Sequence, residues 1–131
     1  VVVHARRAVD AVIAAIRRHA PLRGVVHSYA GSAEQAKQLQ DLGFLVGLGG
    51  PVTYERANRL RRLAASLPIE QLLLETDAPD QPDAEIRGQR NEPARLATVL
   101  SVIAELRDEA PGDIAAATTR NAERLFGLRE T

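Results

Sequence analysis

The sequence predicts an α/β fold in which parallel strands alternate with helices. Short apolar runs recur along the 131 residues, and each is followed by apolar side chains at the i, i+3, i+4 spacing of an amphipathic helix. Strict alternation of this kind predicts parallel strands joined by helical crossovers. Two architectures fit the pattern: a small doubly wound sheet, and half of a (β/α)₈ barrel, which in full takes about 250 residues.

The first two βα units come from the N-terminal third of the chain. Val1–Val3 is a β-branched run, for which we expect a strand buried on both faces. Apolar residues at helical spacing over 9–16 predict the first helix. The second strand lies in "GVVHSYAG". Ser32 and Gln35 fit a capping box, which predicts a helix over 33–42.

The remaining units follow the same order. "FLVGLGG" predicts a third strand that runs into a glycine-rich turn, and the apolar spacing over 60–67 predicts a helix that Pro68 ends. "QLLLETD" predicts the fourth strand. A long helix is expected over 96–106, with Asn91 as its cap, and a last helix over 113–126. The chain is thus four βα units and an extra C-terminal helix, with no linker that divides it.

Composition excludes several classes of protein. Seventeen basic and seventeen acidic side chains balance, which disfavours a dedicated nucleic-acid or membrane-surface binder, and few aromatic residues are available to stack on bases. Without cysteine there are no disulfides, thiol nucleophiles or thiolate metal ligands. No apolar run approaches the roughly 20 residues that span a bilayer, and no signal-peptide pattern is present, so we expect a cytoplasmic protein with no membrane contact.

Three of the four predicted strands end in a side chain that can bind a metal. The first ends in His4, the second in His27 and the fourth in Asp77. Because catalytic groups of parallel α/β folds gather at the carboxyl ends of the strands, these side chains are candidates for one site. Imidazole and carboxylate are common ligands of first-row divalent ions. Taken singly, each has a plainer explanation as a polar residue meeting solvent or closing a turn.

No side chain is a convincing protein nucleophile. Ser28, Ser32 and Thr76 lack the G-x-S-x-G setting of a nucleophile elbow, and the chain has neither a Walker loop nor G-x-G-x-x-G. A metal-activated water is the simpler nucleophile.

Six segments of the chain, taken in order, resemble the C-terminal half of the TatD-like metal-dependent hydrolases. They are "VVVHARRA", "GVVHSYAGSAEQA", "GFLVGLGGPVTY", "LLLETDAP", "RNEPARL" and "TTRNAERLFGL". The resemblance covers essentially the whole chain. It implies an α/β fold that is the C-terminal half, four βα units plus a C-terminal helix, of a TIM-type (β/α)₈ barrel in the metal-dependent hydrolase superfamily. Residues 1–131 are therefore expected to be a partial domain whose N-terminal half of the barrel is missing.

The resemblance also implies a site with two divalent metal ions, which in the family can be Mg, Mn or Zn. It assigns His4 and His27 to one ion, and Asp77 to the other, with Asp77 also a catalytic group. The family's H-x-H pair and bridging glutamate have no counterpart in this sequence. The family often has Cys where Ser28 stands, and an aromatic or apolar residue where Asp80 stands, and both departures concern the substrate pocket.

Four further residues are expected near this site. Glu75 lies two residues before Asp77, so strand alternation places both on one face, and we expect it to hold a ligand histidine or the backbone; its alternative is a buried salt bridge. Arg87 and Arg90, in the loop before the long helix, and Arg6, just after His4, are candidate phosphate contacts. For Arg87 and Arg90, the alternative is a solvated loop.

The resemblance implies hydrolysis of DNA, most commonly as a 3′-5′ exonuclease. The alternatives are a metal-dependent ester or amide hydrolase, such as a D-aminoacyl-tRNA deacylase, and a non-catalytic α/β interaction module. Because half of the expected ligands are absent, we expect the 131 residues alone to be inactive. A half-barrel would also leave two strands as sheet edges, which favours self-association.

Overall fold

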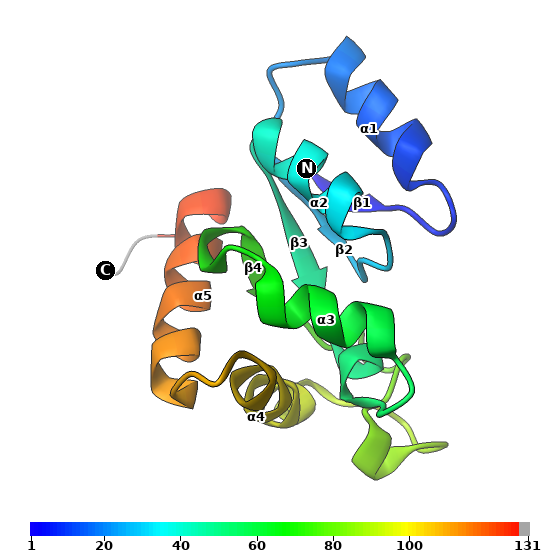
Figure 1. Ribbon diagram of the computed structural model, residues 1–131, viewed down its shortest axis with the longest axis vertical. Coiled ribbons are helices and arrows are strands. Elements are labelled where there is room, and N and C mark those ends of the chain that lie inside the picture. The colour runs from blue at the N-terminus through cyan, green and yellow to red at the C-terminus, as the bar shows by residue number, and fades with distance from the viewer. Residues whose placement is uncertain (129–131) are drawn as a thin grey trace.

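A four-stranded parallel sheet runs through the computed structural model, which describes residues 1–128 (Figure 1). Strands that are consecutive in the chain pair with each other, and within residues 1–128 the strand order shows no reversal. A doubly wound sheet requires such a reversal, whereas a barrel does not, so the order favours the barrel. The strands are Val2–His4 (β1), Gly24–His27 (β2), Phe44–Leu48 (β3) and Leu72–Leu74 (β4).

Helices connect the strands and follow the last one, as the sequence predicted. Ser32 and Gln35 form the expected capping box: Gln35 N donates to Ser32 Oγ at 3.1 Å and Ser32 N to Gln35 Oε1 at 2.9 Å. None of the described helices is long and apolar enough to cross a membrane. The α-helices are Val9–Arg18 (α1), Ala33–Asp41 (α2), Asn58–Ser66 (α3), Leu96–Arg107 (α4) and Pro111–Phe126 (α5), and the 3₁₀ helices Gly50–Thr53 (η1), Ile69–Gln71 (η2), Ala84–Ile86 (η3) and Pro93–Arg95 (η4).

Helices cover one face of the sheet, and the other face carries further apolar strand residues, among them Val25 and Leu73, with the histidine pair at its carboxyl end. Alternate strand residues pack with the helices into the hydrophobic core, among them Val26, Val46 and Leu72. Right-handed crossovers between neighbouring strands bring successive helices to the same side of the sheet, which explains why one face carries this core. The other residues point away from it: His4 pairs with His27, and Gly47 pairs with Leu73.

The first strand is more exposed than its sequence suggested. We expected Val1–Val3 to be buried on both faces, but the side chains of Val1 and Val2 are 63% and 61% exposed. The prediction was wrong because β1 lies at an edge of the sheet and pairs only with β2 in the described residues. The second edge is β4.

Asn121 of α5 fixes the last helix to the last strand. Its side chain is 3% exposed, and Nδ2 donates to the carbonyl oxygens of Ile69 at 2.7 Å and Leu72 at 2.9 Å. These bonds satisfy carbonyl groups at the start of β4 and so hold the strand that leads into Glu75 and Asp77.

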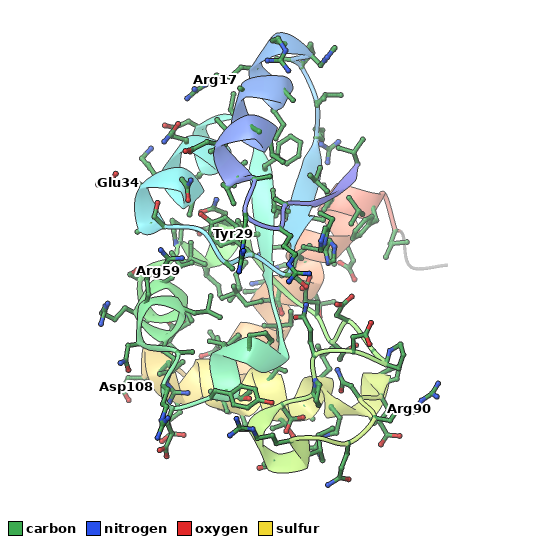
Figure 2. The ribbon with its side chains drawn as sticks, turned by 90° about the vertical axis from the view of Figure 1, so that its right-hand side faces the viewer. Arg17, Tyr29, Glu34, Arg59, Arg90 and Asp108 are labelled. Atoms are coloured by element: carbon green, nitrogen blue, oxygen red, sulfur yellow. The ribbon has the colours of Figure 1, made fainter. Side chains whose placement is uncertain are left out.

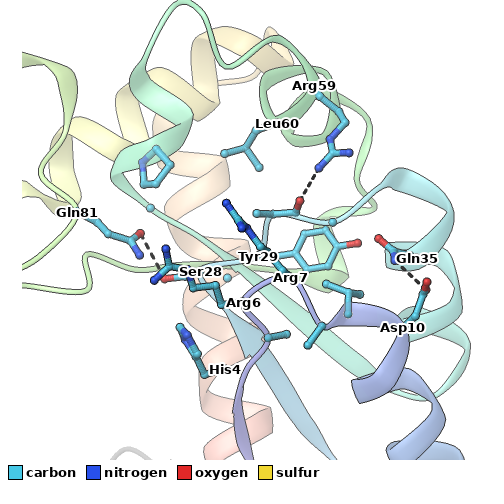
Figure 3. Close-up of a pocket in the computed structure, with 18 of the residues that line it drawn as sticks. His4, Arg6, Arg7, Asp10, Ser28, Tyr29, Gln35, Arg59, Leu60 and Gln81 are labelled. Carbon is cyan, nitrogen blue, oxygen red and sulfur yellow. Dashed lines mark hydrogen bonds between the residues drawn. The ribbon is translucent and has the colours of Figure 1, made fainter.

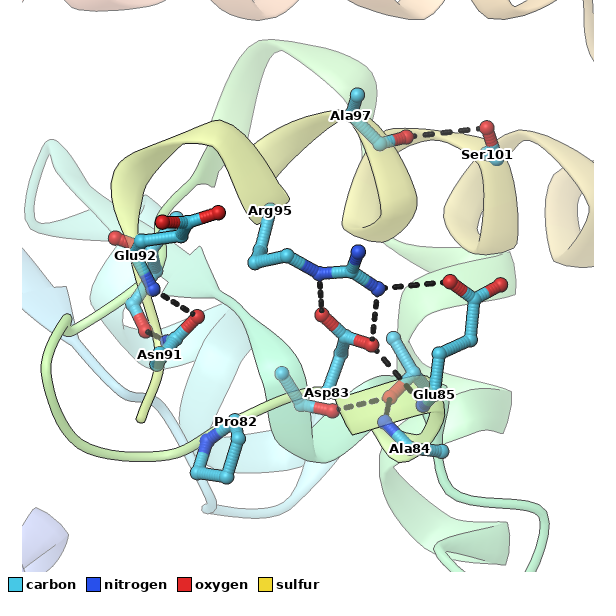
Figure 4. Close-up of polar contacts among 12 residues, drawn as sticks. Pro82, Asp83, Ala84, Glu85, Asn91, Glu92, Arg95, Ala97 and Ser101 are labelled. Atoms are coloured by element: carbon cyan, nitrogen blue, oxygen red, sulfur yellow. Dashed lines mark hydrogen bonds and ion pairs between the residues drawn. The ribbon is translucent and has the colours of Figure 1, made fainter. Parts of the chain in front are cut away.

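A buried ion pair closes the long segment between β4 and α4 (Figure 4). Asp83 is 1% exposed and receives two bonds from Arg95, Nε to Oδ2 at 2.8 Å and Nη2 to Oδ1 at 2.9 Å. Arg95 Nη2 also contacts Glu85 Oε2 at 2.7 Å. Hydrogen bonding from Arg95 is the main reason that the pKa of Asp83 lies below its usual value.

Replacing Asp83 by Asn should destabilise the fold by about 2–3 kcal/mol at neutral pH, because it leaves Arg95 without its buried carboxylate. Because the folded pKa of Asp83 is lowered, its contribution is present above the unfolded value of about 3.9 and is lost as pH falls through the folded pKa. Urea unfolding across pH should therefore show the difference between D83N and wild type shrinking below about pH 4. E85Q is the control, and since the Glu85 side chain is 70% exposed it should cost at most about 1 kcal/mol. Equal costs for the two variants would contradict the prediction.

Candidate metal centre

Two histidine side chains meet at the carboxyl ends of β1 and β2. His4 and His27 are paired in the sheet register, and His4 Nδ1 lies 2.9 Å from His27 Nε2. His4 is exposed and His27 is half-buried, so the pair lies at the surface of this rim. In the protein alone, one ring donates to the other. The same two nitrogens, aimed at each other, form a donor pair for a divalent ion, whose bonds to imidazole are about 2.0–2.1 Å long.

The carboxylate of Glu75 lies behind this pair. Glu75 Oε1 accepts a hydrogen bond from Ser28 N and lies 4.0 Å from His27 Nδ1. It therefore faces the ring nitrogen of His27 that points away from His4. A carboxylate on the far nitrogen of a ligand histidine fixes the ring's orientation and makes it a better ligand.

Burial raises the pKa of Glu75 above its usual value, and Asp77 adds to that rise through its charge. The Ser28 N–H and His27 act in the opposite direction. The charge on this carboxylate is thus only partly compensated by the described residues around it. A cation on the neighbouring histidines would lower the cost of keeping Glu75 ionised.

Gly47 on β3 makes room for Glu75. A Cβ built on Gly47 would overlap the Glu75 carboxylate, and one on Gly49 would fall 2.8 Å from the Glu75 carbonyl oxygen. The two glycines of "GLG", one in β3 and one just after it, therefore leave space that the side chain and backbone of Glu75 occupy. The sequence showed a glycine-rich turn here but not what it accommodates.

Asp77 lies outside the strand that was predicted to carry it. We expected the fourth strand to run through "QLLLETD", but β4 ends at Leu74, and Asp77 has a left-handed backbone with a φ of 54°. Strand alternation therefore does not determine the direction of the Asp77 side chain relative to Glu75, and that argument was wrong. The physical reason is that β3 ends at Leu48, so the last ladder bond available is Glu75 N to Leu48 O, at 3.0 Å.

Asn91 has a different role from the one predicted for it. We expected it to cap the helix that begins near residue 96, but Glu92 and Arg95 occupy the N-cap positions of η4 and α4. The Asn91 side chain is 3% exposed, and its Nδ2 donates to the carbonyl oxygens of Thr76, Asp80 and Gln81, at 2.6, 2.8 and 3.3 Å. Asn91 therefore holds the turn that carries Asp77.

Of the three arginines predicted to contact phosphate, only Arg6 lines the cavity beside His4. Arg87 lies over the ring of Tyr54, with its guanidinium carbon 5.7 Å from the ring centroid. Arg90 is exposed, and Figure 2 shows it projecting from the edge of the molecule, far from Tyr29.

The cavity has a volume of about 850 Å³ and lies over the loops that follow β1, β2 and β3 (Figure 3). Its lining includes two arginines that sequence reasoning missed, Arg7 and Arg59. Arg7 directly follows Arg6, which was predicted to contact phosphate. Nothing in the sequence around Arg59, on α3, indicates a role at this site.

The donor set fits part of a metal site. Among residues 1–128, no group of three His, Asp or Glu side chains is arranged to hold one ion, so the structure brings His4 and His27 together and leaves Asp77 outside that group. Two imidazole nitrogens with a carboxylate behind one of them are suitable donors for Zn, Mn or a similar ion. An ion held here would need further ligands from outside these residues or from water.

Comparison with known proteins gives a consistent family. The family described as TatD related DNase matches residues 1–127. The uncharacterized metal-dependent hydrolase YjjV of Escherichia coli K12 is 43% identical over 129 residues, which cover 98% of this chain and 50% of that protein. The 3′-5′ ssDNA/RNA exonuclease TatD of Citrobacter rodentium is 39% identical over 109 residues, 79% of this chain and 41% of that protein.

The fold agrees with the sequence comparison. The crystal structure of YjjV from Escherichia coli K12 superimposes with a TM-score of 0.92 at 43% identity, and the match covers 98% of this chain and 50% of that one. The described α/β fold thus matches part of the TIM barrel of this family. The chain spans about half the length of the curated relatives it matches.

Replacing Gly47 by Ala should displace the Glu75 carboxylate from Ser28 and His27, because the new methyl group would take its place. We expect a loss of about 1–3 kcal/mol in urea unfolding, the cost of unpaired polar groups, and a weaker zinc affinity measured by competition with a chromogenic chelator. Gly112→Ala is the matched control. A Cβ on Gly112 meets nothing within 4 Å and it lies in α5, so this change should be neutral or stabilise by up to about 1 kcal/mol. Unchanged stability and zinc affinity in G47A would contradict the role given to Glu75.

Proposed function

The chain belongs to the TatD-related DNase family, and from this we propose that it provides the C-terminal half of a divalent-metal-dependent hydrolase that cleaves DNA phosphodiester bonds, acting as a 3′-5′ exonuclease. The observation that carries the proposal is the His4–His27 pair, whose ring nitrogens face each other at 2.9 Å with Glu75 behind His27. The exonuclease name of the Citrobacter rodentium relative supports the choice of bond.

In this proposal His4 and His27 hold one divalent ion and Asp77 contributes to a second. Such ions, when bound, lower the pKa of a water molecule and offset the charge on the phosphate. Glu75, whose carboxylate lies 4.0 Å from the far nitrogen of His27, would favour an orientation of that ring with Nε2 toward the ion. Asp77 takes up the proton of the attacking water. Asn91 holds the turn that carries Asp77 by its bonds to Thr76, Asp80 and Gln81.

Arg6 is the favoured phosphate contact among the three arginines, because it lines the cavity that His4 also lines. Arg87 and Arg90 stay predictions, and neither lies on that cavity's lining. Cytoplasmic localisation and self-association also stay predictions. The edge positions of β1 and β4 and the exposed Val2 support association between copies when no other chain covers these edges.

Asp77→Asn in the natural full-length protein should reduce metal-dependent hydrolysis of single-stranded DNA by at least about 10²-fold, as expected for the loss of a general base. A chelator should abolish the wild-type activity, and added Mg, Mn or Zn should restore it. Asp41→Asn, a change of the same kind at the exposed end of α2, before the start of β3 and away from the rim, is the control and should keep near-wild-type activity.

Activity that persists in the chelator, or an equal loss in D77N and D41N, would contradict this mechanism. Aminoacyl ester and amide substrates assayed in parallel separate the alternative bonds, since the proposal requires the phosphodiester to be hydrolysed fastest. An absence of hydrolysis on every substrate would favour an interaction module.

The 131 residues alone should bind metal weakly and hydrolyse no DNA, because among residues 1–128 no group of three side chains can hold an ion. Calorimetric titration with zinc and a nuclease assay, each run beside the full-length protein, measure both properties. Hydrolysis by the 131 residues at a rate near that of the full-length protein would contradict the prediction.

A further inference from the structure

We propose that the cavity over β1, β2 and β3 binds a phosphate of the nucleic-acid strand that lies next to the one being cleaved. This inference rests on the proposed function and specifies how the substrate is held outside the metal centre. His4 lines one side of the cavity and bonds to His27, so the cavity reaches one member of the histidine pair. A strand whose end lies at His4 and His27 would therefore pass its next phosphate into this space.

Charge is concentrated in the cavity although the chain as a whole is neutral. Three guanidinium groups, of Arg6, Arg7 and Arg59, line it against a single carboxylate, that of Asp10. Asp10 Oδ1 is engaged by Gln35 Nε2 at 2.8 Å, which offsets part of its charge toward the cavity. The lining thus favours an anion, and arginine is the side chain best suited to bind phosphate oxygens through paired N–H groups.

Two of these arginines have unused donors. Arg6 and Arg7 are exposed and make no hydrogen bond or ion pair with the side chains and backbone of residues 1–128 in the structure. Arg7 has a left-handed backbone, with a φ of 51°, so the two consecutive side chains leave the strand pattern and line the same cavity. Figure 3 shows both near Ser28 and Tyr29, between His4 and Leu60.

The third arginine is partly engaged, and its bond helps to shape the cavity. Arg59 Nη2 donates to Ala30 O at 2.6 Å, which ties α3 to the loop after β2 and leaves its other N–H groups available. Tyr29 forms part of the wall: it is 2% exposed, and its hydroxyl donates to Ser32 O at 2.6 Å.

The cavity combines an apolar wall with cationic groups, and this combination suits a nucleotide better than a bare anion. The lining includes Val9, Pro51 and Leu60, and the volume of about 850 Å³ lies within the range of ligand pockets, which is about 300–1,000 Å³. An apolar wall accommodates sugar and base, while the arginines hold the phosphate. The subsite would therefore recognise the phosphate and not the base sequence, since no described contact would identify a particular base.

The test measures binding to the full-length protein in the presence of a chelator, so that no strand is cut. A fluorescent single-stranded oligonucleotide is titrated against wild type, R6Q/R7Q and R17Q/R18Q. The control pair removes the same charge from consecutive arginines in the last turn of α1. Equal thermal midpoints for the three proteins establish that folding is unchanged.

We expect R6Q/R7Q to weaken binding at least 10-fold, and R17Q/R18Q to weaken it less than 3-fold. The slope of log Kd against log salt should fall by about 0.7 in R6Q/R7Q, because the cavity holds one phosphate and each phosphate neutralised on a single strand adds about 0.7 to that slope. An oligonucleotide with a neutral methylphosphonate beside its terminal linkage should bind wild type as weakly as R6Q/R7Q binds the native strand. With metal restored, KM should rise in R6Q/R7Q while kcat stays near wild type.

Equal affinities of R6Q/R7Q and R17Q/R18Q would overturn the inference, as would tight binding of the methylphosphonate strand. The proposed function fails separately, through the D77N and chelator experiment. A protein that binds the strand through Arg6 and Arg7 but hydrolyses no phosphodiester would retain the anion subsite and lose the nuclease assignment.

Discussion

The carboxylate of Glu75 is the constraint on which the rim depends, because it connects all four strands through a chain of contacts. It extends from the end of β4 into a gap that Gly47 leaves in β3, accepts the Ser28 N–H after β2, and faces His27, which in turn meets His4 of β1. Burial raises its pKa, so the fold keeps a poorly compensated acid next to two imidazoles. A buried carboxylate of this kind costs stability if its role is purely structural. A cation bound by the histidines would offset that cost.

Much of the fold could be predicted from local patterns, because local physics determines it. The capping box at Ser32 and Gln35 needs only four consecutive residues, and the apolar spacing of each helix reflects which face it buries. Parallel strands and a common rim follow from the alternation of elements. The order of the strands did not follow from it, and that order decides between a barrel and a doubly wound sheet.

The parts that sequence reasoning missed depend on contacts between distant residues. Ser28 and Glu75 are 47 residues apart, and Asn91 lies 15 residues from Thr76, whose carbonyl oxygen it binds. Nothing near Gly47 in the chain shows that the space left by its absent side chain is filled by a carboxylate. Nothing near Asn91 shows whether its side chain caps a helix or binds the carbonyl oxygens of a turn. The same limit explains the error over Asp77: the strand pattern continues in the sequence, but β3 ends and leaves no partner for pairing beyond Glu75.

Stability and reactivity are divided between the two sides of the segment that follows β4. On the side of α4, Asp83 is buried and bound twice by Arg95, and Asn91 binds three carbonyl oxygens of the turn. On the rim side, His4 is exposed and bonds only to His27 among the described side chains, and Asp77 has a left-handed backbone, a conformation that few residues other than glycine, asparagine and aspartate adopt. The bonds from Asn91 hold this turn in one conformation. A rim built in this way can leave the side chains that we propose as ligands free of strong protein contacts, so that they stay available to a metal ion or a phosphate.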